Sequence, residues 1–356
     1  MVRTVSEPLT PPGDLPPIPP QRPAQRRHLT IRHFLFTLAV LAALLAVTAA
    51  VAVTLGSERI PLAELWDALR GRPLSPEHQT ILFELRLPRL ALAIVVGAGL
   101  AVAGAAFQAL LRNPLAEPYV LGVSSGASLG AVAAIMFAAA VPYSRPFFAF
   151  GGAALTTLVV YQLGRGRAGE SSDKLILAGV ITTSFLSAAN IFLTMLASSV
   201  QLRGITFWLL GDLSLGGGDL LPALSIIVLG ATVGIYWNAR SLNLLMVGER
   251  DALALGVEVG RVRFVIFTLA SLITGVVVAV GGSVGYVGLI VPHIIRLAFG
   301  TDYRLLIPAA MLGGSILVLA ADTVARTAVA PRELPVGAVL AMIGAPLFIY
   351  LLRRTN

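Results

Sequence analysis

The chain has 356 residues, of which 56% are hydrophobic and only 12% charged, and its formal net charge is +8. Soluble domains carry about 25% charged residues, and no soluble core could bury this much apolar surface. The composition therefore excludes a soluble globular protein and indicates a polytopic membrane protein. The sequence contains no cysteine, which excludes disulfides and thiolate metal sites as well.

The basic residues do not indicate a nucleic-acid partner. They are almost all arginine, since Lys174 is the only lysine, and they are scattered between apolar runs instead of forming a continuous stripe. Membrane topology explains such a distribution better than nucleic-acid binding does. We therefore expect membrane lipids, and no nucleic acid, around this chain.

Residues 1–33 include the proline-rich stretch "PLTPPGDLPPIPPQRPAQRRH". Such a composition cannot form a packed element and predicts a disordered cytoplasmic tail. It is not a cleavable signal, because the first apolar run begins only at Phe34 and is long enough to span. Arg26, Arg27 and Arg32 are expected to anchor this run on the cytoplasmic side, and residues 34–356 to form a single transmembrane domain.

The apolar runs predict an all-α fold of about ten transmembrane helices, at roughly 20 residues per crossing. We expect them near residues 34–55, 88–111, 119–140, 146–164, 175–198, 221–238, 264–282, 286–299, 305–322 and 335–352. An even number of spans places both termini on one side of the membrane. Most of the 26 arginine and lysine residues fall in segments that share a side with the tail, so we expect both termini to be cytoplasmic.

Small residues recur within the predicted spans. Gly97, Ala101 and Ala105 lie four residues apart, and Gly313 and Gly314 are adjacent in mid-span. Small residues let helix backbones approach closely in lipid, where no hydrophobic force drives helices together. The pattern predicts a dense bundle with several central helices.

The stretch "RNPLAEPYVLGVSSGASLG" (112–130) interrupts the apolar pattern. Pro114 and Pro118 prevent a continuous helix through it, and irregular backbone at membrane depth survives only when it is buried in protein or lines a watery cavity. We therefore expect it to line a pathway, through Glu117, Ser124, Ser125 and Gly126. The alternative for Glu117 is that it only caps a helix beginning near Tyr119.

Long ordered motifs carry a family resemblance. They are "LRLPRLALAIVVGAGLAVAGAAFQALLRNPLAEPYVLGVSSGASLG", "LILAGVITTS", "GYVGLIVPHIIRLAFGTDYRLLIPAAMLGGSILVLAADTVAR" and "ELPVGAVLAMIGAPLFIYLL". The chain from Phe34 onward resembles the FecCD-type permeases, the membrane subunits of bacterial ABC importers for iron–siderophore chelates, haem and cobalamin. The resemblance implies the type II importer permease fold, with ten spans per subunit and an inner-membrane location.

The same resemblance implies partners and a cargo. The expected assembly is a homodimer with the pathway at the dimer interface, two cytoplasmic ATP-binding subunits and one periplasmic substrate-binding protein. An iron chelate, siderophore or haem, is the expected cargo because most of the family carries one, and cobalamin is the alternative.

Three groups of site residues follow from the resemblance. The loop 238–263 contains a short polar–apolar helix bracketed by Gly248 and Gly256. It resembles the segment that couples to the ATPase, through Gly248, Glu249, Arg250, Asp251, Leu253, Ala254, Leu255 and Gly256. The cytoplasmic gate is expected at Ser171, Ser172 and Asp173. Docking of the binding protein at the outer surface is expected to involve Arg86, Arg89 and Arg326.

The sequence also lacks several features. It has no G-x-x-x-x-G-K-[ST] motif, so ATP must be bound by a partner and the chain is not expected to be an enzyme. Its histidines, at positions 28, 33, 78 and 293, are too dispersed for a metal site. We expect His293 to make a helix-end hydrogen bond, not to ligate haem, and we expect no cofactor.

Two other function classes fit less well. An ion-coupled secondary transporter would place several charged residues deep in its spans, and only Glu117 and Asp322 come near. A membrane-embedded enzyme would need helical clusters of His, Asp or Glu, which the sequence lacks.

Overall fold

The computed structural model describes residues 29–56, 58, 60–166, 169–170, 172–214 and 218–355, so nearly all of the predicted tail lies outside the described residues. The elements are α1 (Ile31–Thr54), α2 (Leu62–Leu69), α3 (Pro76–Thr80), η1 (Ile81–Arg86), α4 (Leu87–Leu110), α5 (Val123–Phe137), α6 (Ser144–Gly164), β1 (Arg165–Gly166), β2 (Gly169–Glu170), α7 (Ser172–Met195), α8 (Ser199–Leu209), α9 (Leu221–Trp237), α10 (Ala239–Val247), α11 (Glu249–Ala254), α12 (Val259–Gly281), α13 (Val287–Phe299), α14 (Tyr303–Thr327) and α15 (Val336–Thr355).

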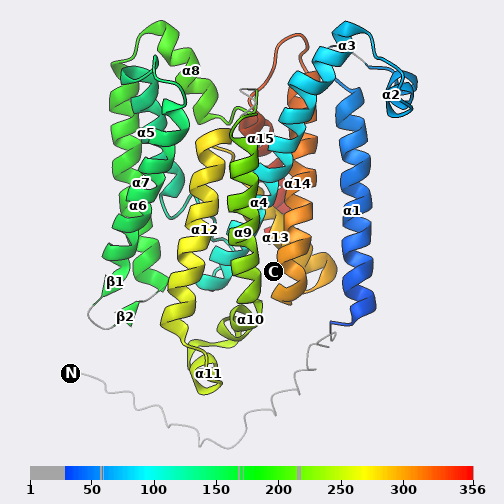
Figure 1. Ribbon diagram of the computed structural model, residues 1–356. Coiled ribbons are helices and arrows are strands. Elements are labelled where there is room, and N and C mark those ends of the chain that lie inside the picture. The colour runs from blue at the N-terminus through cyan, green and yellow to red at the C-terminus, as the bar shows by residue number, and fades with distance from the viewer. Residues whose placement is uncertain are drawn as a thin grey trace, which may run out of the picture.

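The long helices run side by side, with short elements at both ends of the bundle (Figure 1). We call one end the α8 end, which also carries α2 and α3, and the other the α11 end, which also carries α10 and the β1–β2 hairpin. The hairpin pairs two strands of two residues each, so the fold is all-α in substance, as predicted.

An apolar helix lies at each of the ten predicted spans. Among the described residues, six helices are long and apolar enough to cross a membrane, and α9 with α10 makes a seventh segment bent by 53°. The other three predicted spans correspond to the shorter apolar helices α5, α13 and α15. Hydropathy located these segments because apolar length is a local property of the sequence.

Helix α4 forms the centre of the bundle. It continues α3 through the π-helical turn η1, and 78% of its most apolar window is buried, against 11% for α1 at the periphery. It packs on α14, α12 and α13. A Cβ atom at Gly97 or at Gly314 would collide with the other residue's carbonyl oxygen, so both positions must be glycine for α4 and α14 to approach this closely.

A second group is formed by α5, α6, α7 and α8, the green helices in Figure 1. Helix α5 packs against α6 and α7, and α12 contacts both α6 and the central α4. Helix α12 therefore joins the two groups. The sequence did not predict α8, although Ser198 and Gln201 form a capping box at its start, which is a signature that can be read from sequence.

Candidate functional site

The arginines expected to dock a partner form a buried ion-pair cluster at the α8 end. Arg89 Nε lies 2.9 Å from Asp322 Oδ1, and Arg326 Nε lies 3.0 Å from Asp322 Oδ2. The Asp322 side chain is fully buried. Arg89 also pairs with Glu333, at 2.7 Å. One carboxylate in mid-cluster therefore holds two cations that come from α4 and α14.

Arg86 lies nearby and is also buried. Its guanidinium donates to the carbonyl of Val53 at 2.6 Å and to that of Glu58. All three guanidinium groups thus have partners within the subunit. The sequence had indicated only that these arginines lie at the outer surface. A docking role stays a prediction. Asp322 and Glu333 are the residues that the site prediction missed.

The link between α4 and α5 turns sharply, with positive φ at Arg112 (48°) and Gly122 (77°). Helix α5 begins at Val123 with Gly122 as its N-cap and no side-chain cap. The alternative that Glu117 caps a helix near Tyr119 is therefore wrong, because Pro118 and the turns after it delay the helix.

Glu117 instead points into the protein. Its Oε2 is buried and has no hydrogen-bond partner among the described residues, while the backbone N–H of Tyr286 donates to its carboxylate. Burial raises the pKa of Glu117 to about 7, against the opposing effect of that hydrogen bond. This carboxyl group can exchange a proton near neutral pH, as functional carboxyls often do.

The other expected pathway residues are packed to different degrees. Ser124 and Gly126 are buried within the subunit, and a Cβ at Gly126 would collide with Thr156 of α6. Ser125 is partly exposed, and its carbonyl accepts a hydrogen bond from Asn190 Nδ2 at 3.3 Å. Within one subunit, Gly126 therefore serves the packing of α5 on α6.

The expected coupling segment is a short helix at the α11 end. Helix α11 spans Glu249–Ala254 between Gly248 and Gly256, as predicted, and Gly256 takes φ +82° to end the turn. Ala252 is buried, whereas the Leu253 and Leu255 side chains are 59% and 66% exposed. Two exposed leucines at the tip of a loop make an apolar surface suited to a protein partner. Arg250 and Asp251 are exposed beside them.

Glu249 ties this helix to the bundle. Its Oε1 lies 2.5 Å from Arg263 Nη2, at the start of α12, and 3.3 Å from Arg112 Nη2, just after α4. The Arg263 side chain is almost fully buried. One carboxylate thus connects α11 with the ends of two central helices, a link that the sequence did not indicate because the partners are distant in the chain.

The expected gate lies partly outside the described residues. Ser171 lies outside them, and Ser172 opens α7 as its first residue. Asp173 is exposed in the first turn of α7. The first turn of α7 stands at the α11 end, next to the β1–β2 hairpin (Figure 1).

His293 does not make the hydrogen bond that we expected. Its ring packs edge-on against Phe348, and its Nε2 is buried without a hydrogen-bond partner in the described part of the chain. The apolar surroundings in α13 supply no acceptor. Within the described ranges, no group of three or more His, Asp or Glu side chains could hold a metal ion.

A buried polar link between α4 and α13 was also missed. Gln108 Nε2 donates to the Gly288 carbonyl at 3.2 Å, and Arg296 donates to Gln108 Oε1. Gln108 is the only polar side chain in the apolar run 95–111. That isolation was a usable signal, because a buried amide needs partners.

This architecture defines a class of protein. The described residues form ten apolar segments, with α4 at their centre, and one small helix that presents leucines outside the bundle. These are the features of the membrane subunit of a transporter. The chain belongs to the FecCD transport family, whose pattern matches residues 44–354. It is an ABC importer permease, and membership in the family implies ATP-binding and substrate-binding partners.

Several curated relatives are similar over most of their length. The uncharacterized ABC transporter permease protein YvrB of Bacillus subtilis is 41% identical, over 88% of this chain and 92% of its own. The cobalamin import system permease BtuC of Halobacterium salinarum is 40% identical, over 87% and 86%. The hemin transport system permease HmuU of Yersinia pestis is 37% identical, over 87% and 93%.

A solved structure has the same fold. It is an inward-facing conformation of a metal-chelate type ABC transporter, with a TM-score of 0.79, 32% identity and coverage of 90% of this chain and 99% of its own. The family resemblance and the permease fold are thereby confirmed. The chain is a multi-pass membrane protein, and the relatives named above are permease subunits.

Proposed function

We propose that this chain forms a homodimeric permease that imports an iron chelate, siderophore or haem, driven by two partner subunits that hydrolyse ATP. The observation that carries the proposal is α11, a compact helix with exposed Leu253 and Leu255 that is tied through Glu249 to the central helices. A small helix held by an ion pair can transmit a rigid-body push with little loss.

The α11 end is the cytoplasmic end in this proposal. Helix α1 begins there, where His33 Nε2 lies 3.0 Å from the Phe299 carbonyl oxygen. Helix α15 begins at the α8 end, since the Val336 amide bonds to the Gly211 carbonyl, and runs back toward the α11 end. Both ends of the transmembrane domain therefore lie on the side that carries α11, which supports cytoplasmic termini in an inner membrane.

The names of similar proteins support the proposed cargo. One relative is named for hemin, and the solved structure is of a metal-chelate type transporter. Cobalamin is the second candidate, because the Halobacterium salinarum relative named for cobalamin import is similarly close.

Uptake into proteoliposomes tests the cargo. The permease is reconstituted with its cognate ATPase and binding protein, and uptake of a 55Fe-siderophore, hemin and cyanocobalamin is measured with and without ATP. ATP-dependent uptake of an iron chelate supports the proposal. Uptake of cyanocobalamin alone would move the assignment to the second candidate, and uptake that needs an ion gradient but not ATP would overturn the importer mechanism.

The dimer and its gate are part of the same proposal. Helices α7 and α15 expose large apolar side chains, such as Phe185 and Met342, at more than two thirds of their surface, and these helices are available to a second copy. Ser171, Ser172 and Asp173 at the start of α7 would then close the pathway on the cytoplasmic side, with Glu117 and Ser125 further along it.

Coupling is tested at the tip of α11. Leu255→Asp places a charge on the exposed apolar tip without disturbing the buried Ala252. We expect the ATPase to be lost from the purified complex while the permease dimer remains. The matched control is Val329→Asp, another exposed apolar position, at the α8 end (50% exposed, against 66% for Leu255). An ATPase that co-purifies at full yield with Leu255→Asp contradicts the coupling role.

Docking of a binding protein is proposed at the α8 end. The guanidinium groups of the three arginines are already paired within the subunit. They would therefore contribute by keeping this surface in shape and by giving it positive charge, and not by forming new ion pairs; the residues are Arg86, Arg89 and Arg326. Charges of this kind act mostly on the association rate and its salt dependence.

A further inference from the structure

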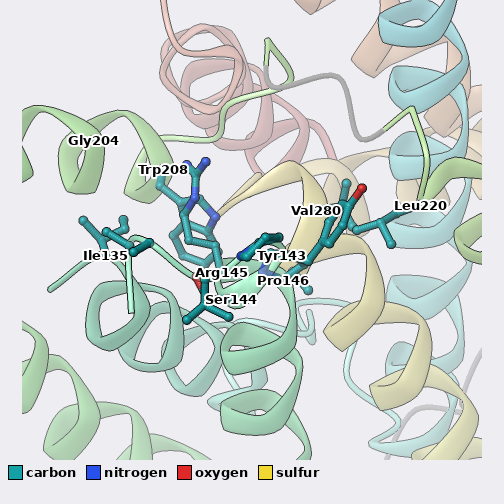
Figure 2. A pocket seen from close by; sticks show the side chains of 14 residues that line it. Ile135, Tyr143, Ser144, Arg145, Pro146, Gly204, Trp208, Leu220 and Val280 are labelled. Carbon is teal, nitrogen blue, oxygen red and sulfur yellow. The ribbon is translucent and has the colours of Figure 1, made fainter. Parts of the chain in front are cut away.

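Two cavities lie along the seam between α6 and α12. The first, of about 500 Å³, lies at the α8 end and is lined by the start of α6, by α8 and by the end of α12 (Figure 2). The second, of about 300 Å³, is a groove lined only by α6 and α12, from Phe150 to Tyr161 on one side and from Phe264 to Gly275 on the other.

The cavities follow one another along the same helix faces. On α12, the lining residues Phe264, Thr268, Leu272, Gly275 and Ala279 recur every three or four positions, which places them on one face. A Cβ at Gly275 would lie 3.1 Å from the Ala153 Cβ, so the helices touch where one cavity passes into the next. The two cavities are therefore neighbours, one helical turn apart on each helix, with Pro146 and Phe150 on α6 and Ala279 and Gly275 on α12.

The part of the groove nearer the α8 end lies within one membrane leaflet of the first cavity. Ala279, in the first cavity, and Thr268, in the groove, are 11 positions apart in α12, which corresponds to about 17 Å at 1.5 Å per residue. Half of a hydrocarbon core of about 30 Å is about 15 Å. A fatty acyl chain that enters at the first cavity can thus lie in the groove about as far as Thr268.

The cavity at the α8 end carries charge. Figure 2 shows the side chains of Arg145, Tyr143 and Trp208 gathered there. Arg145 makes no hydrogen bond or ion pair with any other residue that the structure describes. Tyr143, held at a φ of 58°, donates its hydroxyl to Asp219 Oδ2 at 2.7 Å. A free cation and a fixed carboxylate therefore stand at the same end of the seam.

The groove offers almost no polar surface. Phe150, Tyr161, Phe264 and Phe267 supply aromatic walls. A peptide segment would leave its backbone N–H and C=O groups without partners there, at a cost of several kcal/mol for each group, and a chelate rich in polar groups would be no better matched. Hydrocarbon needs no partners, so it is the occupant that the groove fits.

We propose that the α6–α12 seam binds one membrane phospholipid, with its phosphate at Arg145 and one acyl chain in the groove. A zwitterionic ethanolamine headgroup fits best, because its ammonium can face Asp219 while its phosphate meets the guanidinium. Tyr143 and Trp208 are the aromatic residues typical of headgroup level. The bound lipid fills the joint between the central helices and the α5–α8 group.

Bromine quenching of Trp208 tests this site. Trp66→Phe and Trp237→Phe leave Trp208 as the single tryptophan, and the detergent-purified chain is titrated with dibrominated phosphatidylethanolamine. We expect saturable quenching in this background and a Kd about tenfold higher after Arg145→Gln, since a charge-assisted bond is lost. Arg203→Gln, an exposed arginine on α8 outside the cavity, should leave the Kd unchanged.

A second pair of variants tests the groove. Ala154→Phe fills it from α6, whereas Leu155→Phe adds the same ring at the next, outward-facing position. Only the first should raise the Kd. Quenching that never saturates, or equal affinities in all variants, would show ordinary lipid contact and overturn the site. Equal binding of dibrominated diacylglycerol, which lacks phosphate, would overturn the role of Arg145. Each variant is first checked for a monodisperse size-exclusion profile.

Discussion

Asp322→Asn is the sharpest test of how the α8 end is held together. Asp322 is fully buried and lies 2.9 Å from Arg89 and 3.0 Å from Arg326, whose side chains are themselves only about a tenth exposed. An asparagine keeps the shape but removes the charge, and its amide nitrogen would face a guanidinium donor. The variant therefore leaves two neighbouring cations with one remaining counter-charge, Glu333.

The expected loss is large. Removing one partner of a buried ion pair costs about 3–5 kcal/mol because the other charge stays buried without compensation. Glu333 still pairs with Arg89 at 2.7 Å, so we expect the lower part of this range, about 3 kcal/mol. The matched control is Asp67→Asn, which breaks an exposed pair with Arg72 and should cost at most about 1 kcal/mol.

The assay is equilibrium unfolding in mixed micelles of mild detergent and dodecyl sulfate, followed by tryptophan fluorescence. A third variant replaces the three charged residues with apolar ones: Arg89→Met, Asp322→Leu and Arg326→Met. It measures the net contribution of the cluster to the free energy of unfolding, since replacing all members of a buried ion-pair cluster with apolar residues can be neutral. An Asp322→Asn variant that loses no more than Asp67→Asn would refute the burial of this cluster.

Three further predictions address docking, protonation and the gate. Glu333→Gln makes the α8 end more positive beside Arg89 and should speed the association of an acidic binding protein at low salt, measured by stopped flow. Glu64→Gln, at the same end, should change the association rate less. Equal effects of the two variants contradict docking beside Arg89. Burial raises the pKa of Glu117 from 4.5 to about 7, so the folded state binds more protons than the unfolded state between these pH values. The free energy of unfolding should therefore fall as pH rises from 4.5 to 7, by about 3 kcal/mol at 1.36 kcal/mol per pH unit. Glu117→Gln should flatten the dependence of the melting temperature on pH between pH 5 and pH 8, and an unchanged slope contradicts the assignment. Ser172→Cys in both copies should permit cross-linking that blocks uptake, and free uptake after efficient cross-linking places the gate elsewhere.

The spans could be predicted from sequence because each is a local run of apolar residues. The short helix α11 was predicted for a related reason, since Gly248 and Gly256 mark its two ends. Helix α8 was missed because it is only 11 residues long and has no apolar run of spanning length.

The side-chain networks could not be predicted in the same way. Arg89 and Asp322 are 233 positions apart in the chain, and no local pattern shows that α4 lies beside α14. For the same reason the sequence did not indicate that Arg86 hydrogen-bonds the Val53 carbonyl in the last turn of α1. Pairing across a bundle depends on packing, which in turn depends on glycines such as Gly97 and Gly314.

The distribution of these links shows which part of the subunit is rigid. Among the described residues, α4 is joined to α14 through Arg89, to α13 through Gln108, and to α11 and α12 through Arg112 and Glu249. In the proposed coupling, a push on α11 would reach the ends of α4 and α12 through the ion pairs of Glu249 with Arg112 and Arg263. The α5–α8 group meets this framework through α12, which contacts both α5 and α6, and the two cavities lie along the α6 contact. Packed helices can slide past one another in small shear movements, so we expect movement at this joint when the pathway opens.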